Sequence, residues 1–125
     1  MAPLVSVVDD DISVRRSLER LIRSAGLDVS VFVSAEEFLA SDHSRKVDCL
    51  ILDVRLPGMS GVELYRHLLA SECKLPVIFI TAHGSDDRIR SEAASDWTVA
   101  FFNKPFGGDE LLEAVSRALK RKSGE

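Results

Sequence analysis

The sequence predicts an α/β domain in which a five-stranded parallel sheet carries helices on both faces. Five short apolar runs of the kind that form buried strands alternate along the chain with five amphipathic stretches of helical period. At 125 residues the chain has the length of one domain, and no internal repeat interrupts the alternation. Such alternation forms right-handed βαβ units, which set the strands parallel and the helices on the two faces.

The five expected strands are short β-branched or apolar runs bounded by polar or turn-forming residues: 4–8, 28–32, 49–52, 76–80 and 99–102. The run at 49–52 is the most apolar, which predicts a central strand ending at Asp53. The run at 28–32 alternates apolar and polar residues, which predicts a strand near an edge of the sheet.

The five expected helices place apolar residues at helical spacing: about 14–25, 34–40, 61–72, 85–95 and 109–121. Gly26 ends the first helix, and Ser34 with Glu37 forms a capping box for the second. The residues of the third helix that we expect to face inward are Val62, Tyr65, Leu68 and Leu69.

The fourth and fifth helices differ in how well their sequences provide for packing. The fourth offers mainly Ile89, Ala93 and Ala94 as apolar anchors, so we expect it to be weakly held. The inner face of the fifth is apolar along its whole length, through Leu111, Leu112, Val115, Ala118 and Leu119. The basic residues that follow predict a helix end passing into a tail.

The composition argues against several classes of protein. A formal net charge of −4 offers no electrostatic footprint for direct binding of nucleic acid or of an anionic membrane. The N-terminus shows no signal peptide, and no run approaches the roughly 18 apolar residues of a membrane span. Cys49 and Cys73 have no metal-ligand spacing, so we expect reduced thiols in a cytoplasmic protein.

Polar side chains follow four of the five expected strands. Asp9 and Asp10 follow the first strand, Asp53 the third, Thr81 the fourth and Lys104 the fifth. In an open parallel sheet, ligands bind beyond the carboxyl ends of the strands, where the strand order reverses. We therefore expect three carboxylates, a hydroxyl and an ammonium group to converge on one rim of the sheet.

This set of side chains suits phosphoryl transfer. Clustered carboxylates repel one another and gain by holding a divalent cation, and carboxylate oxygens together with a phosphate suit Mg²⁺. A carboxylate nucleophile forms an aspartyl phosphate, and Thr81 and Lys104 can neutralise the phosphoryl oxygens. Taken singly each residue has a simpler role, since Asp10 or Asp11 could cap the first helix and Lys104 could sit in a surface turn. The combination favours a site.

Four motifs resemble those of the receiver domains of two-component response regulators. They are Val-Asp-Asp-Asp at 8–11, Leu-Asp-Val-Arg-Leu-Pro-Gly-Met-Ser-Gly at 52–61, Ile-Thr-Ala at 80–82 and Asn-Lys-Pro-Phe at 103–106. The likeness covers essentially the whole chain and is greatest to receivers of FixJ-type transcriptional regulators. It implies a flavodoxin-like (βα)₅ fold with strand order 2-1-3-4-5, which puts the aspartates at the switch point.

The resemblance also implies a role for each residue of the rim. Asp53 would be the phosphoacceptor, Thr81 and Lys104 would bind the phosphoryl oxygens, and Thr81 and Phe101 would form the switch. The implied ligands of Mg²⁺ are Asp9, Asp10, Asp53 and the backbone carbonyl of Arg55.

The implied partners are a sensor histidine kinase and a covalently linked DNA-binding effector domain, with homodimerisation on phosphorylation as one readout. The signal would leave through the face formed by the fourth helix, fifth strand and fifth helix. Residues 1–121 would form the receiver, and 122–125 a tail or the start of a linker. The arginines of the first helix, Arg15, Arg16, Arg20 and Arg23, form either a solvated face or a contact for the kinase.

The chain departs from the family pattern between Thr81 and Lys104, where the segment at 96–100 is one residue longer. Trp97 either covers the core or marks a partner surface, and His83 either modulates access to the rim or is an ordinary loop residue. A haloacid-dehalogenase-like phosphatase is disfavoured because Arg55 stands where its second aspartate belongs. A nucleotide-binding motif is absent. A degenerate receiver acting as an interaction module, independent of phosphorylation, stays open.

Overall fold

The computed structural model describes residues 2–41, 46–82 and 87–122. The strands in these ranges are β1 Leu4–Val8, β2 Asp28–Phe32, β3 Cys49–Asp53, β4 Val77–Thr81 and β5 Thr98–Asn103. The helices are α1 Ile12–Ser24, α2 Ala35–Ala40, α3 Gly61–Ala70, α4 Asp87–Ala93 and α5 Gly108–Lys122. The alternation predicted from the sequence is therefore confirmed.

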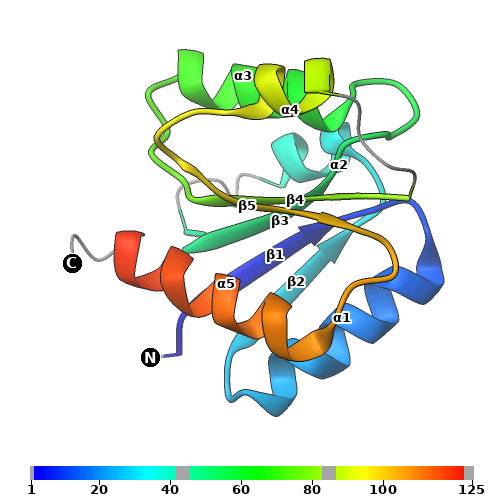
Figure 1. The fold of residues 1–125 in the computed structure, drawn as a ribbon, viewed down its shortest axis with the longest axis vertical. Helices are drawn as coiled ribbons and strands as arrows, with labels where there is room; N and C mark the ends of the chain where they lie inside the picture. Colours follow the sequence, from blue (N-terminus) through cyan, green and yellow to red (C-terminus); the bar gives the residue numbers. More distant parts are fainter. Residues whose placement is uncertain (1, 42–45, 83–86, 123–125) are drawn as a thin grey trace.

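The five strands form one parallel sheet in the order β2-β1-β3-β4-β5, as predicted. Figure 1 shows α1 and α5 on one face of the sheet and α2, α3 and α4 on the other. The chain moves outward from β1 to β2, then crosses to β3 on the other side of β1. The order thus reverses between β1 and β3, and side chains that follow these two strands meet at one edge.

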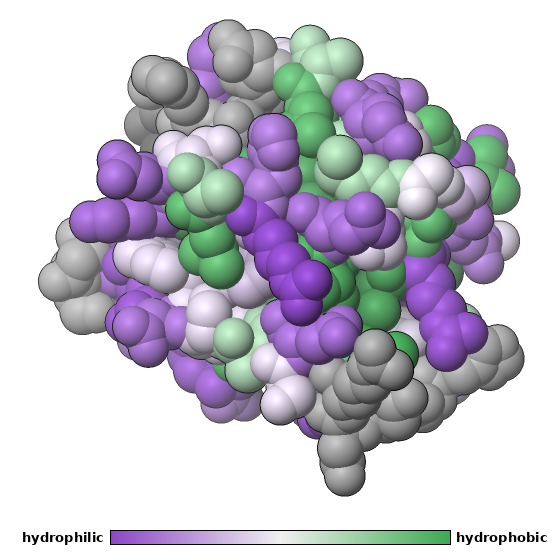
Figure 2. Space-filling view, turned by 90° about the horizontal axis from the view of Figure 1, so that it is seen from above, coloured by the Kyte–Doolittle hydropathy of each residue, from purple (hydrophilic) through white to green (hydrophobic). Residues whose placement is uncertain are grey.

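Alternating residues of the central strands fill two cores, one on each face of the sheet. Val7 and Ile51 pack with Leu18 of α1 and Val115 of α5, and all four are buried. Leu52, the next residue along β3, belongs to the other core, which includes residues of α2, α3 and α4. Figure 2, which looks onto the α3 and α4 side, shows polar side chains interspersed with apolar ones.

Two expectations about helix faces were wrong. Leu69 of α3 is 38% exposed, and Leu64 is fully buried in its place. The reason is the helical period, because Leu64 and Leu68 are four residues apart and share the face that Tyr65 also occupies. In α4 Ala93 is buried and Ile89 partly buried, but Ala94 lies beyond the helix and is exposed.

The fourth helix is shorter than the expected 85–95, since it ends at Ala93. Residues 85 and 86, and also His43 and His83, lie outside the described residues. Just after α4, the pairing between β4 and β5 shifts: Val77 pairs with Thr98, but Ile78 pairs with Ala100. Val99 is therefore an extra residue in β5, a β-bulge within the segment whose spacing the sequence shows to be longer.

Among the described residues, no helix is both long and apolar enough to cross a membrane.

Candidate functional site

The carboxyl ends of β1, β3, β4 and β5 bring the predicted site residues to one edge of the sheet. One oxygen atom from each of Asp9, Asp10 and Asp53 lies within 4.8 Å of the others. Asp9 is fully buried and Asp53 is 4% exposed, whereas Asp10 is exposed to solvent. The cluster therefore has two buried carboxylates and one that opens to water.

Lys104 joins the two buried carboxylates. Its Nζ lies 2.8 Å from Asp9 Oδ2 and 3.1 Å from Asp53 Oδ2. The backbone fixes its position as well, because Lys104 N donates to the carbonyl oxygen of Thr81 over 2.7 Å. Burial alone would lower the pKa of Lys104, but the hydrogen bond to Asp9 and the charges of Asp53 and Asp9 outweigh it and raise the pKa. The ammonium group thus stays charged.

Short backbone contacts orient each buried carboxylate. Asp11 N donates to Asp9 Oδ1 over 2.9 Å, and Arg55 N donates to Asp53 Oδ1 over 3.0 Å. Asp11 is also the N-cap of α1, since its carboxylate accepts from Ser13 N over 2.8 Å. The capping role that the sequence analysis weighed against the site thus belongs to Asp11, and Asp9 is left to face the rim.

The pKa of Asp53 is raised from 3.8 to about 6. Burial is the main cause, and the neighbouring charge of Asp9 adds to it. The hydrogen bond from Arg55 and the charge of Lys104 oppose the shift without cancelling it. Asp53 is thus an ionised carboxylate at neutral pH, poorly compensated by the protein alone.

The site fits a divalent cation on the evidence of its own atoms. Asp9 Oδ2 is fully buried, and its contact among the described residues is the Lys104 ammonium group, which it shares with Asp53 Oδ2. A buried charged oxygen in this state costs free energy unless a further positive group meets it. All three acids offer hard oxygen donors, which Mg²⁺ prefers. The predicted ligand set is consistent with this geometry.

The loop from Val54 to Ser60 carries Arg55 past the site. Its end is fixed by Gly61, where a side chain would collide with the carbonyl oxygen of Asp53, so α3 begins against the backbone of the site. Gly61 N also donates to Val54 O over 3.0 Å. Only glycine permits this close approach.

Thr81 lies next to Lys104 of the site, whereas Phe101 lies farther back along β5. Thr81 is 2% exposed and pairs with Asn103 at the end of β5, next to Lys104. Phe101 of β5 pairs with Phe79 of β4, two residues before the pair of Asn103 and Thr81. Phe101 is half-buried, and its ring stacks on that of Phe79 with centroids 5.9 Å apart. The guanidinium group of Arg90 lies 4.6 Å from the centre of the Phe101 ring. The Phe101 ring therefore contacts both a buried aromatic ring and a cation.

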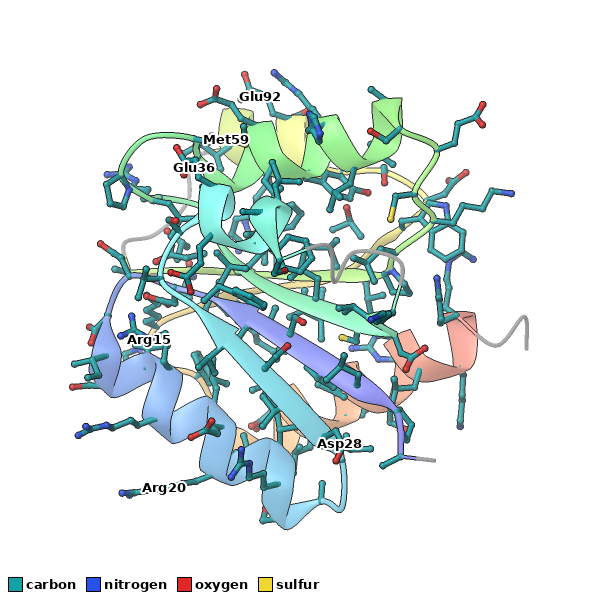
Figure 3. All side chains as sticks on the ribbon, turned by 180° about the vertical axis from the view of Figure 1, so that it is seen from behind. Arg15, Arg20, Asp28, Glu36, Met59 and Glu92 are labelled. Carbon is teal, nitrogen blue, oxygen red and sulfur yellow. The ribbon has the colours of Figure 1, made fainter. Side chains whose placement is uncertain are left out.

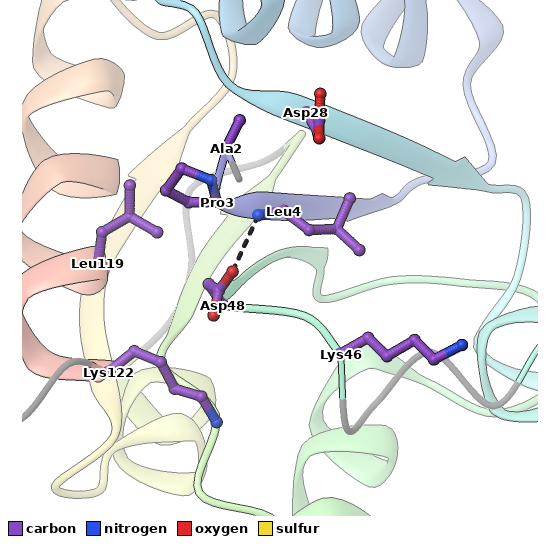
Figure 4. Close-up of a pocket in the computed structure, with 8 residues that line it drawn as sticks. All are labelled: Ala2, Pro3, Leu4, Asp28, Lys46, Asp48, Leu119 and Lys122. Carbon is purple, nitrogen blue, oxygen red and sulfur yellow. Dashed lines mark hydrogen bonds between the residues drawn. The ribbon is translucent and has the colours of Figure 1, made fainter.

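A hollow of about 860 Å³ lies at the opposite edge of the sheet, among the amino ends of the strands (Figure 4). Leu4, Asp28 and Asp48 mark the starts of β1, β2 and β3 there, and Asp48 Oδ2 accepts a hydrogen bond from Leu4 N over 2.9 Å. None of the predicted site residues lines this hollow. Its size alone does not make it the site of chemistry.

Comparison with known proteins decides the family. The response regulator receiver domain family matches residues 5–116. The chain belongs to this family. Receiver domains are signalling domains of two-component systems, and the FixJ-type likeness predicted from the sequence is confirmed by a crystal structure of FixJ-N. It is 38% identical, has a TM-score of 0.83, and the match covers 96% of this chain and 95% of that one.

Curated relatives show the wider context of this receiver. It is 48% identical to nodulation protein W of Bradyrhizobium diazoefficiens and 43% identical to response regulator protein TodT of Pseudomonas putida. The matches cover 94% and 95% of this chain and 52% of each relative. The structure of response regulator StyR is 41% identical with a TM-score of 0.86, and the match covers 99% of this chain and 62% of that one. The chain spans about half the length of the curated relatives it matches.

Two side chains that the sequence does not point to as site residues bind the backbone around the site. The sequence puts Arg15 on an arginine-rich face of the first helix, but in the structure its Nη1 donates to the carbonyl oxygen of Asp9 over 2.8 Å. Figure 3 shows Arg15 on the site side of α1, whereas Arg20 points away from the protein. Glu36 of α2 accepts a hydrogen bond from Met59 N over 2.9 Å. Helical position could have suggested the first contact, but no local pattern links residues 23 apart.

Proposed function

We propose that this receiver accepts a phosphoryl group on Asp53 from the phosphohistidine of a sensor histidine kinase. The observation that carries the proposal is the pairing of Asp53 with the half-buried Lys104 and with a second buried carboxylate, Asp9, at the switch point. A pocket that clusters carboxylates and one lysine is suited to positioning and charge neutralisation, which is most of what phosphoryl transfer requires.

In this proposal Asp9, Asp10, Asp53 and the backbone carbonyl of Arg55 hold Mg²⁺. When bound, the ion supplies positive charge to the acids and to the incoming phosphoryl oxygens. The fit rests on the close approach of the three carboxylates and on the two buried ones, Asp9 and Asp53, sharing a single ammonium group.

The chain's own residues would then carry the transfer. A carboxylate oxygen of Asp53 attacks phosphorus, the bond from phosphorus to the imidazole nitrogen breaks, and the histidine leaves with the electron pair of that bond. Lys104 stays charged beside the reacting carboxylate and attracts the phosphoryl oxygens. The Thr81 hydroxyl binds a phosphoryl oxygen from the end of β4, where it is buried.

The output we propose is control of transcription through the face formed by α4, β5 and α5. Relatives of this chain include the transcriptional regulatory proteins TdiR and FixJ, 42% and 35% identical. Thr81 would move toward the phosphoryl group and Phe101 would follow, which shifts the population between two existing states. Homodimerisation and a linked DNA-binding domain after residues 122–125 would read that shift, in the cytoplasm.

The test is the mass of the intact protein after incubation with Mg²⁺ and a small acyl phosphate. We expect an adduct of one phosphoryl group, absent without Mg²⁺ and absent in Asp53→Asn. Asp96→Asn, an exposed acid outside the rim, is the matched control and should be phosphorylated like the unaltered protein.

An unmodified mass under these conditions would contradict the proposal. It would instead support the reading of a receiver that acts by protein contact alone.

A further inference from the structure

The loop between β3 and α3 begins next to Asp53 and ends with Gly61 against the Asp53 backbone, so its shape matters to the site. Its first part is fixed by the bond from Arg55 N to Asp53 Oδ1, and its last part by the capping box of Ser60 and Glu63. Between them, Gly58 adopts a left-handed conformation with φ +75°. The middle of the loop therefore bends where neither anchor acts.

Glu36 supports that middle part from another element. Its Oε2 accepts from Met59 N over 2.9 Å, and this bond joins α2 to the loop. Figure 3 shows the two residues side by side, Glu36 on α2 and Met59 before α3. The helix is itself anchored, because Ser34 caps it and Phe38 is buried. The carboxylate thus reaches the loop from a fixed position.

Gly58 and Glu36 are matched to each other. A side chain at residue 58 would collide with Glu36 Oε2, so only glycine satisfies both the left-handed turn and the approach of the carboxylate. The hydrogen bond from Met59 also holds the pKa of Glu36 below its ordinary value. The contact is therefore made by a charged acceptor that stays charged through the physiological range.

We infer that Glu36 is a positioning residue for the metal site. By holding Met59 it fixes the β3–α3 loop in the shape that presents the Arg55 carbonyl to the cation beside Asp53. This rests on the proposed function, since it assumes that the acid cluster binds Mg²⁺. Residues that orient ligands from outside a metal site commonly change its affinity by a factor of 10 or more when removed.

The experiment is a calorimetric titration of the folded protein with Mg²⁺ alone, with no phosphodonor. We expect Glu36→Ala to weaken Mg²⁺ binding by about tenfold. Glu37→Ala is the matched control, because Glu37 is the next residue of α2 and is exposed. The capping box expected with Ser34 is only half formed, since Ser34 Oγ accepts from Glu37 N but the Glu37 side chain has no hydrogen bond with a described residue. Glu37→Ala should therefore bind Mg²⁺ like the unaltered protein.

Glu36→Gln separates positioning from charge. Its amide oxygen can still accept from Met59 N, so we expect Mg²⁺ affinity within about twofold of the unaltered protein. Amide hydrogen exchange at Met59 should be faster in Glu36→Ala and close to unaltered in Glu36→Gln. If Gln weakens binding as much as Ala, the carboxylate acts only through its charge and the inference is wrong.

The two proposals fail in different ways. Failure of the unaltered protein to bind Mg²⁺ or to form the adduct overturns the proposed function. Normal binding by the unaltered protein together with equal binding by Glu36→Ala overturns only the role of Glu36.

Discussion

β3 and β5 lie two strands apart in the same sheet, yet every residue of β3 is buried and every residue of β5 keeps some exposure. The acids at the ends of β3 and β1 are held by two backbone hydrogen bonds and by the half-buried Lys104. The helix beside β5, α4, is only seven residues long. The proposed chemistry thus lies beside a fully buried strand, and the proposed output beside a partly exposed one.

Among the described residues, the polar contacts that join α4 to its neighbours are part-buried or exposed. Thr98 Oγ1 donates to the carbonyl oxygen of Ala93 at the end of α4 and lies 3.2 Å from the Tyr65 hydroxyl. Arg66 of α3 and Glu92 of α4 form an exposed ion pair at 3.9 Å, which contributes little. Regions with few buried contacts open at low free energy. This is the property that a two-state output face needs.

The largest expected difference between the two regions is in the free energy of unfolding lost when one of two stacked rings is removed. Phe79 of β4 is fully buried and Phe101 of β5 is half-buried, although the rings stack on each other. We expect Phe79→Ala to lower the free energy of unfolding by about 4 kcal/mol and Phe101→Ala by about 1–2 kcal/mol. Urea unfolding measures both. Equal costs would mean that β5 is as firmly packed as β4.

The sequence predicts the position of the site and of the irregularity in β5. The rim was predictable because alternating strands and helices make a parallel sheet, whose carboxyl ends share one edge. The position of each residue at the end of a strand is therefore enough to predict that Asp53, Thr81 and Lys104 lie on the rim. The position of the longer spacing was also visible, and the structure has a bulge at Val99 there.

The features that the sequence does not predict are contacts between residues far apart in the chain. The apolar pattern of α3 predicts an inward Leu69, but such a pattern leaves the exact rotation of the helix open, and packing buries Leu64 instead. The bond between Glu36 and Met59 needs α2 and the β3–α3 loop to be set side by side, which no local pattern encodes.

The second prediction concerns the electrostatic cost of the acid cluster. The folded protein holds the Asp53 proton more tightly than the unfolded chain, because its pKa rises from 3.8 to about 6. The contribution of Asp53 to stability is therefore greatest below pH 4 and is lost as the pH rises to about 6. Asp53→Asn should raise the free energy of unfolding by about 1–2 kcal/mol at pH 7.5 in a chelator, a value reduced for screening by water.

Thermal unfolding from pH 4 to 8 tests this. The unaltered protein should lose stability across the window from pH 4 to 6, and Asp53→Asn should show a flatter profile. Added Mg²⁺ should stabilise the unaltered protein more than the variant, because the ion binds only the folded site. A variant less stable than the unaltered protein at pH 7.5 would show that the Lys104 pair outweighs the repulsion from Asp9.

The third prediction tests how α4 is held. Thr98→Val keeps the shape of the side chain but removes the hydroxyl that bonds Ala93 O, so we expect a loss of about 1 kcal/mol. Amides of α4 should exchange faster, and those of β3 should not change. Thr98→Ser keeps the hydroxyl and is the control. A uniform increase in exchange across the sheet would show that Thr98 supports the whole fold.

The smallest expected effect lies at the junction of α5 with the segment before β5. Arg121 places its guanidinium group 4.6 Å from the centre of the Trp97 ring, and Trp97 packs on the core beneath. Arg121→Ala should lower the free energy of unfolding by about 0.5 kcal/mol, the range for exposed cation–π pairs.

Trp97 is the one tryptophan of the sequence, so its fluorescence reports this contact directly. Arg117→Ala, an exposed residue four positions earlier on α5, should leave the emission unchanged. If both variants shift the emission equally, Trp97 responds to the charge of α5 and the ring contact is not what orders this segment.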